Sequence, residues 1–166
     1  NSRTYMTRKT DVYVSPENRA KMAKGEINDA YWVTLPKNGD GTKDGVDFFF
    51  SIHCNSSTNS SDFGTSAHIY DAINWNYSVN QSSNDFKFGK SLVDEYITST
   101  QTVFINAKKA YSTTGVVGRE SLIILNVTHI KNSFNLPRAV ALLETEFASN
   151  STTWDWLQNG GYQIKA

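Results

Sequence analysis

Two short apolar runs, each followed by an ionisable residue, dominate the pattern of hydrophobic and polar positions along this chain. In residues 47–53, three consecutive phenylalanines and an isoleucine lead to His53. In residues 139–144, Ala-Val-Ala-Leu-Leu leads to Glu144. Continuous apolar runs of this length are typical of strands that are covered on both faces of a sheet. We therefore predict two buried strands, one ending in a histidine and the other in a glutamate.

The two strand ends indicate a candidate site if the strands are parallel neighbours. Ligands of open α/β sheets bind in the crevice beyond the carboxyl ends of the strands, so His53 and Glu144 would face the same crevice. Burial of an unpaired carboxylate is unfavourable, which favours a functional role for Glu144. An imidazole and a carboxylate can serve a zinc hydrolase as metal ligand and general base. Taken alone, a histidine at a strand end is more often structural.

The rest of the chain alternates between helical and extended patterns, as expected of an α/β protein. Ser15–Pro16 is typical of a helix start, and Gly25 of a helix end. Apolar residues at helical spacing predict a helix over residues 86–102. Leu122–Leu125 is predicted to be a short strand, and residues 150–153 are predicted to cap a final helix. The predicted fold is α/β with three layers: a mostly parallel sheet flanked by helices on both faces.

Composition and charge narrow the classes of function. A length of 166 residues is enough for one domain with an adequate core, and we predict a single domain over residues 1–166. The 16 basic residues balance 16 acidic ones, which gives no electrostatic case for a nucleic-acid partner. No apolar run reaches about 18 residues, so no membrane span is predicted. The single cysteine, Cys54, cannot form an internal disulfide and is predicted to be a small core residue.

Four segments of the chain, taken together, resemble one known family. They are Thr7-Arg8-Lys9-Thr10-Asp11 followed by Ser15 and Arg19, Phe50-Ser51-Ile52-His53-Cys54-Asn55, Gly64–Tyr70, and Leu136–Asn150. In order and spacing they are similar to segments of the zinc-dependent N-acetylmuramoyl-L-alanine amidases, which are cell-wall enzymes of bacteria and phage lysins. Among these segments are the family's Thr-Arg-x-x-Asp, Ser-Ile-His-x-Asn and Pro-x-x-Leu-x-Glu-x-x-Phe-x-Ser-Asn sequences. The resemblance extends over most of the chain.

The resemblance implies an activity and a set of site residues. The expected reaction is hydrolysis of the amide bond between N-acetylmuramic acid and the L-alanine of the peptidoglycan stem peptide, outside the cell or in its envelope. Zinc, the implied cofactor, lowers the pKa of bound water from about 15.7 toward 7. Glu144 is then expected to act as general base and afterwards as acid, and His53 as one of three protein ligands. Asn55 and His129 are expected near the substrate, although His129 is more readily interpreted as a structural loop residue.

Two departures from the family keep a second interpretation open. The family's other zinc ligands precede its Thr-Arg segment, and this chain begins almost at that segment, so we expect residues 1–166 to be an internal part of an amidase domain. Glu146 stands where the family usually has a small residue, and it could share the site with Glu144, turn outward or pair with Arg138. The alternative function is a non-catalytic amidase-like domain, structural or wall-binding, of a phage particle or envelope assembly. A third interpretation, an α/β hydrolase that uses a serine, is poorly supported because no Gly-x-Ser-x-Gly sequence occurs.

Overall fold

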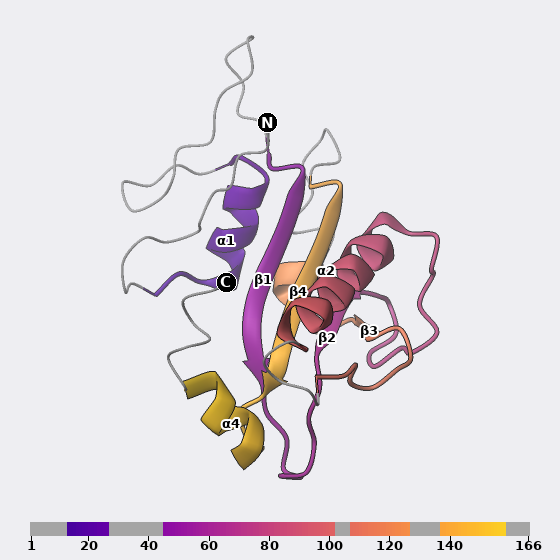
Figure 1. Ribbon diagram of the computed structural model, residues 1–166. Coiled ribbons are helices and arrows are strands. Elements are labelled where there is room, and N and C mark those ends of the chain that lie inside the picture. Colours follow the sequence, from indigo (N-terminus) through magenta and orange to yellow (C-terminus); the bar gives the residue numbers. More distant parts are fainter. Residues whose placement is uncertain (1–12, 27–44, 102–106, 127–136, 159–166) are drawn as a thin grey trace. The chain divides into compact units, whose positions relative to one another are not determined.

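The computed structural model describes residues 13–26, 45–101, 107–126 and 137–158 and contains a four-stranded sheet. The strands are β1 (Phe48–Asn55), β2 (Ser66–Tyr70), β3 (Val116–Arg119) and β4 (Ala139–Phe147), and their order in the sheet is β1-β4-β2-β3 (Figure 1). The helices are α1 (Pro16–Ala23), α2 (Asn84–Thr100) and α4 (Ser151–Gln158), with a 3-10 helix, η1, at Ile123–Leu125. The predicted α/β class is confirmed.

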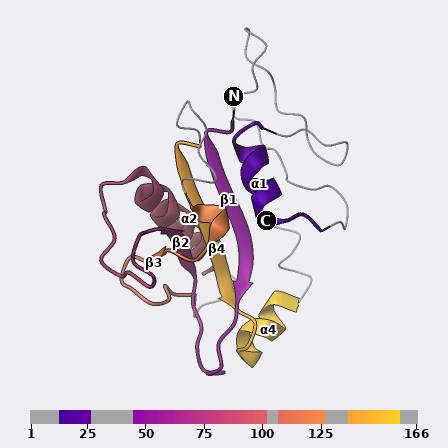
Figure 2. The ribbon, with the colours of Figure 1, turned by 180° about the vertical axis from the view of Figure 1, so that it is seen from behind.

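The sheet is mostly parallel, as predicted. Strands β1 and β4 run the same way, because Arg138 N–H donates to the carbonyl of Asp47 (2.7 Å) and Ala148 N–H donates to that of Asn55 (2.8 Å). Strands β2 and β3 are also parallel, whereas β2 and β4 are antiparallel. From both sides of the sheet, β4 is seen between β1 and β2 (Figures 1 and 2). The two strands expected to be parallel neighbours are therefore parallel neighbours.

The expectation that both strands are covered on both faces is correct for β4 and wrong for β1. Every residue of Ala139–Leu143 is buried. In β1, by contrast, only alternate positions are buried, and Phe48, Phe50 and Ile52 are 57%, 43% and 63% exposed. The two strands differ in burial because β4 lies between two other strands of the sheet, whereas β1 is at the end of the strand order. Cys54, near the end of the same strand, is exposed and not the core residue that was predicted.

The short strand predicted at Leu122–Leu125 is also wrong. Those residues include the 3-10 helix η1, and the strand of this region is β3, which lies earlier in the chain. A short apolar run without alternation does not distinguish a strand from a helical turn. The residues of β3 instead gain their extended form from pairing with β2, in a register that runs from Ala67 opposite Val116 to Tyr70 opposite Arg119.

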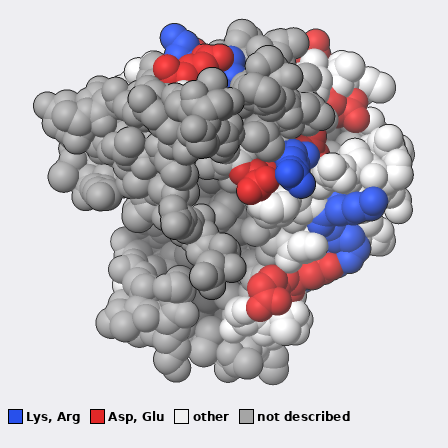
Figure 3. Space-filling model, turned by 90° about the horizontal axis from the view of Figure 1, so that it is seen from above, with Lys and Arg blue, Asp and Glu red and all other residues white. Residues whose placement is uncertain are grey.

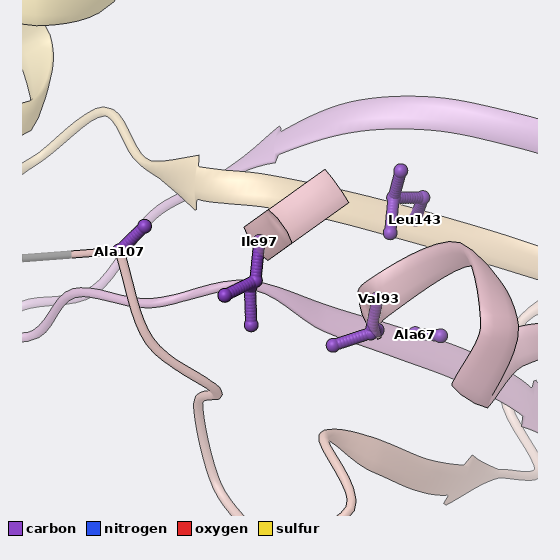
Figure 4. Packing of buried hydrophobic residues seen from close by; sticks show 5 residues of the cluster. All are labelled: Ala67, Val93, Ile97, Ala107 and Leu143. Atoms are coloured by element: carbon purple, nitrogen blue, oxygen red, sulfur yellow. The ribbon is translucent and has the colours of Figure 1, made fainter. Parts of the chain in front are cut away.

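Helix α2 covers one face of the sheet, and its packing tells which strand side chains point toward it. The helix starts as capping chemistry predicts, since Ser83 Oγ accepts the N–H of Phe86 (3.1 Å). Val93 and Ile97 on α2 pack with residues of β2 and β4 in one cluster (Figure 4). The cluster comprises Ala67, Val93, Ile97, Ala107 and Leu143. Side chains alternate along strands, so Ser66 and His68 of β2 and Leu142 and Glu144 of β4 lie on the face opposite α2.

The described residues belong to two compact units, formed by residues 1–49 with 121–140 and by residues 50–120 with 141–166. In the first, α1 begins where Ser15 Oγ accepts the N–H of Asn18 (3.2 Å) and ends before Gly25, which has a φ of 78°. In the second, α4 is capped by Asn150 Oδ1, which accepts the N–H of Thr152 (3.0 Å). Both predicted helix starts are confirmed.

Charges of opposite sign lie close together on the described surface. Lys90 and Lys109 both form ion pairs with Asp94. Figure 3 shows acidic and basic side chains next to one another on the face that it displays. No helix within the described ranges combines the length and the apolar character that a bilayer crossing requires.

Candidate functional site

Glu144 has an unusual environment for a carboxylate, and it is the starting point of the site. It lies on β4, on the sheet face opposite α2, and is partly buried. Its Oε2 atom is buried and has no hydrogen-bond partner among the described residues. Burial raises the pKa of the Glu144 carboxyl, and the charge of Arg119 opposes that rise. Buried polar atoms in native proteins are almost always hydrogen-bonded, so a carboxylate oxygen without a partner among the described residues is a candidate for a functional group.

His53 lies on the neighbouring strand, on the same face of the sheet as Glu144. Cys54 points toward the α2 side, where its Sγ is 3.7 Å from Thr145 Oγ1, so the preceding side chain points to the opposite side. The hydroxyl of Thr145 donates to the carbonyl of His53 (3.1 Å), which places His53 level with the residue after Glu144. The imidazole is exposed, and its Nε2 is 2.8 Å from Ser51 Oγ. The structure thus brings the two predicted residues to one face on adjacent strands.

Asn55 and His129, the two residues expected near the substrate, have different outcomes. Asn55 ends β1, and its Nδ2 donates to the hydroxyl of Tyr111 (2.8 Å). It therefore ties the strand end to an aromatic residue that the sequence did not indicate. His129 lies outside the described residues. A substrate role for either residue stays a prediction.

A chain of polar side chains leads across the sheet to the neighbourhood of Glu144. The Nη1 atom of Arg119 is 3.2 Å from Nδ1 of the buried His68. Arginine can only donate, so Nδ1 accepts, and the imidazole proton is on Nε2, which is 3.2 Å from Ser66 Oγ. Burial and the charge of Arg119 lower the pKa of His68 to about 4, which keeps it neutral. Ser66 is directly opposite Glu144 in the β2–β4 pair.

Two aromatic residues pack around His68 and remain partly open to solvent. The ring centroids of Trp75 and Tyr111 are 5.5 Å apart, and they are 5.9 and 6.1 Å, respectively, from that of His68. The guanidinium carbon of Arg119 is 3.9 Å from the centroid of the Trp75 ring. Trp75 and Tyr111 are each 40% exposed. The rings and the guanidinium therefore form one mixed aromatic and cationic cluster.

Trp75 and Tyr111 share a strained backbone conformation. Their φ angles are 59° and 64°, and no other non-glycine residue among the described ranges has a positive φ. Such residues cost about 1–3 kcal/mol each and persist where surrounding contacts hold them. The residue after Trp75 exchanges two backbone hydrogen bonds with Gly118 (3.1 and 2.7 Å), and the residue before Tyr111 donates its N–H to Thr65 (2.9 Å). Strain of this kind is concentrated at functional sites.

Glu146 does not turn outward and does not pair with Arg138. It is fully buried, and its Oε2 accepts the N–H of Gly64 (2.7 Å), while Oε1 is 3.5 Å from Thr65 Oγ1. Arg138 instead pairs with Asp47 at 3.2 Å. Burial raises the pKa of Glu146 to about 7. Glu146 therefore connects β4 to Gly64 and Thr65, the residues that precede β2.

The described residues do not supply a complete metal site. Within the described ranges, no three His, Cys, Asp or Glu side chains converge in an arrangement that could hold a metal ion. Zinc sites use three or four protein ligands, and here His53 offers one imidazole. The described residues alone therefore do not fit a zinc ion.

The sequence indicated His53 and Glu144 as candidates but gave no indication of Arg119, Trp75 and Tyr111. Residue 119 is brought to His68 only by strand pairing between β2 and β3, for which no local pattern exists. Asp71 and Asn76, on either side of Trp75, are residue types that favour turns. They are the sequence feature that comes nearest to predicting an ordered turn at Trp75. The left-handed backbone conformation at Tyr111 could not be predicted from the sequence, because tyrosine does not favour it.

The comparisons with known proteins agree on a family and a fold. A family model described as N-acetylmuramoyl-L-alanine amidase matches residues 1–166. The CwlD amidase from Clostridioides difficile, solved in complex with the GerS lipoprotein, is 18% identical, with a TM-score of 0.51, over 89% of this chain and 53% of that one. The catalytic domain of CwlV, an N-acetylmuramoyl-L-alanine amidase from Bacillus (Paenibacillus) polymyxa var. colistinus, is 17% identical, with a TM-score of 0.53, over 95% of this chain and 62% of that one.

This chain thus spans between half and two thirds of the length of these solved structures. At such identities the likeness to them shows the fold alone. No curated protein sequence matches the chain.

Proposed function

Because this chain belongs to the N-acetylmuramoyl-L-alanine amidase family, we propose that it is part of an enzyme that cleaves the amide bond between N-acetylmuramic acid and L-alanine in peptidoglycan. The observation that carries the proposal is the unpartnered, buried oxygen of Glu144 on the sheet face that it shares with His53. A purely structural sheet has no need for a carboxylate in that position. Residues 1–166 are proposed to be part of one amidase domain, acting outside the cell or in its envelope.

Glu144 is suited to transfer a proton during hydrolysis. A general base works best when its pKa lies near the working pH, and burial moves the pKa of Glu144 upward from its ordinary value. The charge of Arg119 limits that rise, so the carboxylate stays able to accept a proton. We propose that Glu144 takes a proton from the attacking water and returns it to the leaving amine. Asn55 and His129 are proposed to lie near the substrate.

Zinc is the proposed cofactor, with His53 as one ligand. When bound, zinc would supply hydroxide near neutral pH and polarise the scissile carbonyl. The described residues provide the imidazole of His53, and the other ligands are not found among them.

Metal content tests the role of His53. The intact protein is expected to bind one zinc ion, and His53→Ala in it is expected to lower the bound zinc because a ligand is removed. Elemental analysis of dialysed protein gives the molar ratio of zinc to protein. Lys87→Ala, on the exposed side of α2, is the matched control. Equal zinc in the wild type and in His53→Ala would show that His53 is not a ligand.

The products of peptidoglycan digestion test the activity. Cleavage by an amidase releases new L-alanine amino termini without new reducing sugar ends, whereas a glycosidase releases reducing ends. We expect the first pattern from the wild-type protein. No release of either kind by the zinc-loaded protein would instead support the non-catalytic alternative, a structural or wall-binding domain.

A further inference from the structure

We propose that Arg119, Trp75 and Tyr111 form a subsite beside Glu144 that binds a free carboxylate of the stem peptide. The proposal rests on the amidase function proposed above and names the part of the substrate that these residues recognise. The subsite lies on the peptide side of the scissile bond, because only the peptide part provides carboxylates linked through L-alanine.

Arg119 is held in place by neutral groups, which leaves its charge available. Its Nε–H donates to Asn74 Oδ1 (3.0 Å), and an Nη1–H donates to His68 Nδ1 (3.2 Å). None of the ion pairs among the described residues includes Arg119. A guanidinium has five N–H donors, and these two bonds are the ones that Arg119 makes among the described residues, which leaves three donors that no described residue uses. A fixed, planar guanidinium with spare donors matches the geometry of a carboxylate, which it can bind through two hydrogen bonds.

The subsite adjoins the proposed catalytic carboxylate. Burial raises the pKa of Glu144 and the charge of Arg119 opposes that rise; burial likewise raises the pKa of Tyr111, and the charge of Glu144 adds to it, so the three groups lie within electrostatic reach of one another. Ser66 links them structurally, since it is opposite Glu144 in the ladder and next to His68 Nε2. A peptide whose scissile amide lies at Glu144 would therefore reach Arg119 within a short distance along its chain.

Trp75 and Tyr111 give this subsite its shape. Rings that only closed the core would be buried, but each of these is 40% exposed while its backbone is held at a positive φ. Trp75 supports the guanidinium from one side, which restricts its motion before a ligand arrives. Asn55 fixes the hydroxyl of Tyr111 (2.8 Å) and connects the subsite to the end of β1. The strained backbone at Trp75 and Tyr111 thus holds two rings where they can contact the same ligand as the Arg119 guanidinium.

Equilibrium binding tests the proposal without relying on cleavage. The probe is the tripeptide L-alanyl-γ-D-glutamyl-L-lysine amide, whose one carboxylate is the glutamate α-carboxylate, compared with the same peptide carrying an α-carboxamide. Isothermal titration calorimetry is expected to show at least about tenfold tighter binding of the carboxylate form by the wild type, because a hydrogen-bonded charge pair is lost in the amide. Arg119→Gln is expected to bind the two peptides equally.

Two further variants separate recognition from folding. Arg119→Lys keeps the positive charge but loses the planar pair of donors, and it is expected to retain part of the preference for the carboxylate peptide. Arg138→Gln, which removes an arginine that is 70% exposed, is expected to leave the affinities for both peptides unchanged. Undetectable binding, no preference in the wild type, or an undiminished preference in Arg119→Gln would overturn the proposal. Selective binding of the carboxylate form by a protein that cleaves no peptidoglycan would leave the subsite standing and refute the amidase function alone.

Discussion

Glu146 is buried with its charge only partly compensated, and this governs how the stability of the protein responds to pH. Burial raises its pKa from 4.5 to about 7, although the N–H of Gly64 favours the ionised form. Between these values the unfolded chain releases the proton while the folded protein keeps it. Protonated Glu146 therefore makes its full contribution to the free energy of unfolding below pH 4.5. That contribution is lost as the pH rises through about 7, the pKa of Glu146 in the folded protein.

Glu146→Gln is expected to remove this pH dependence. The amide keeps the acceptor for Gly64 N–H but cannot ionise, so the variant should gain stability relative to the wild type, by about 3 kcal/mol, between pH 4.5 and pH 8. Urea unfolding at both pH values measures the change. Comparing the two proteins cancels the contribution of His68, whose lowered pKa gives the opposite slope. A stability difference that is the same at both pH values would contradict this account of Glu146.

At the scale of elements, the turn that carries Trp75 is fastened to β3 at a position that tolerates no side chain. A Cβ on Gly118 would be 2.5 Å from Asp71 Cβ and 2.8 Å from Val79 Cγ1. The same glycine exchanges both of its backbone hydrogen bonds with Asn76. The close approach of turn and strand thus positions Trp75 over Arg119.

Gly118→Ala is expected to destabilise the protein by about 1–3 kcal/mol, because the methyl group must displace the turn. Lys87→Ala, on the exposed side of α2, is the control. The urea midpoint should fall clearly for the first variant and little for the second. Equal midpoints for Gly118→Ala and the wild type would show that the turn does not depend on this contact.

Elements with strong local signals were predictable, and those that depend on partners were not. Helix α2 follows from apolar spacing, and Ser15 and Asn150 mark the starts of α1 and α4 through their side chains. The exposure of β1 depends on its place at the end of the strand order, which no local pattern contains. Strand β3 has four residues, one of them glycine, and becomes a strand only by pairing with β2.

At the scale of the whole molecule, the candidate site combines residues of two kinds. His53 and Glu144 end apolar runs, so the sequence alone indicated them, and parallel pairing of β1 and β4 brings them to one face. Arg119 and Tyr111 reach His68 from segments more than 40 residues away along the chain. The proposed base could therefore be predicted from the sequence, whereas the residues proposed to recognise the substrate required the structure.

The activity of Glu144→Gln on purified peptidoglycan tests the central claim most directly. The substitution preserves the size of the side chain but removes its ability to accept a proton, and loss of general-base catalysis typically lowers the rate by about 10²–10⁴-fold. The zinc-loaded variant is therefore expected to release L-alanine amino termini at least about a hundredfold more slowly than the wild type. Glu95→Gln, on the exposed side of α2, should leave the rate unchanged. Release by Glu144→Gln at the wild-type rate would contradict the assignment of Glu144 as the base.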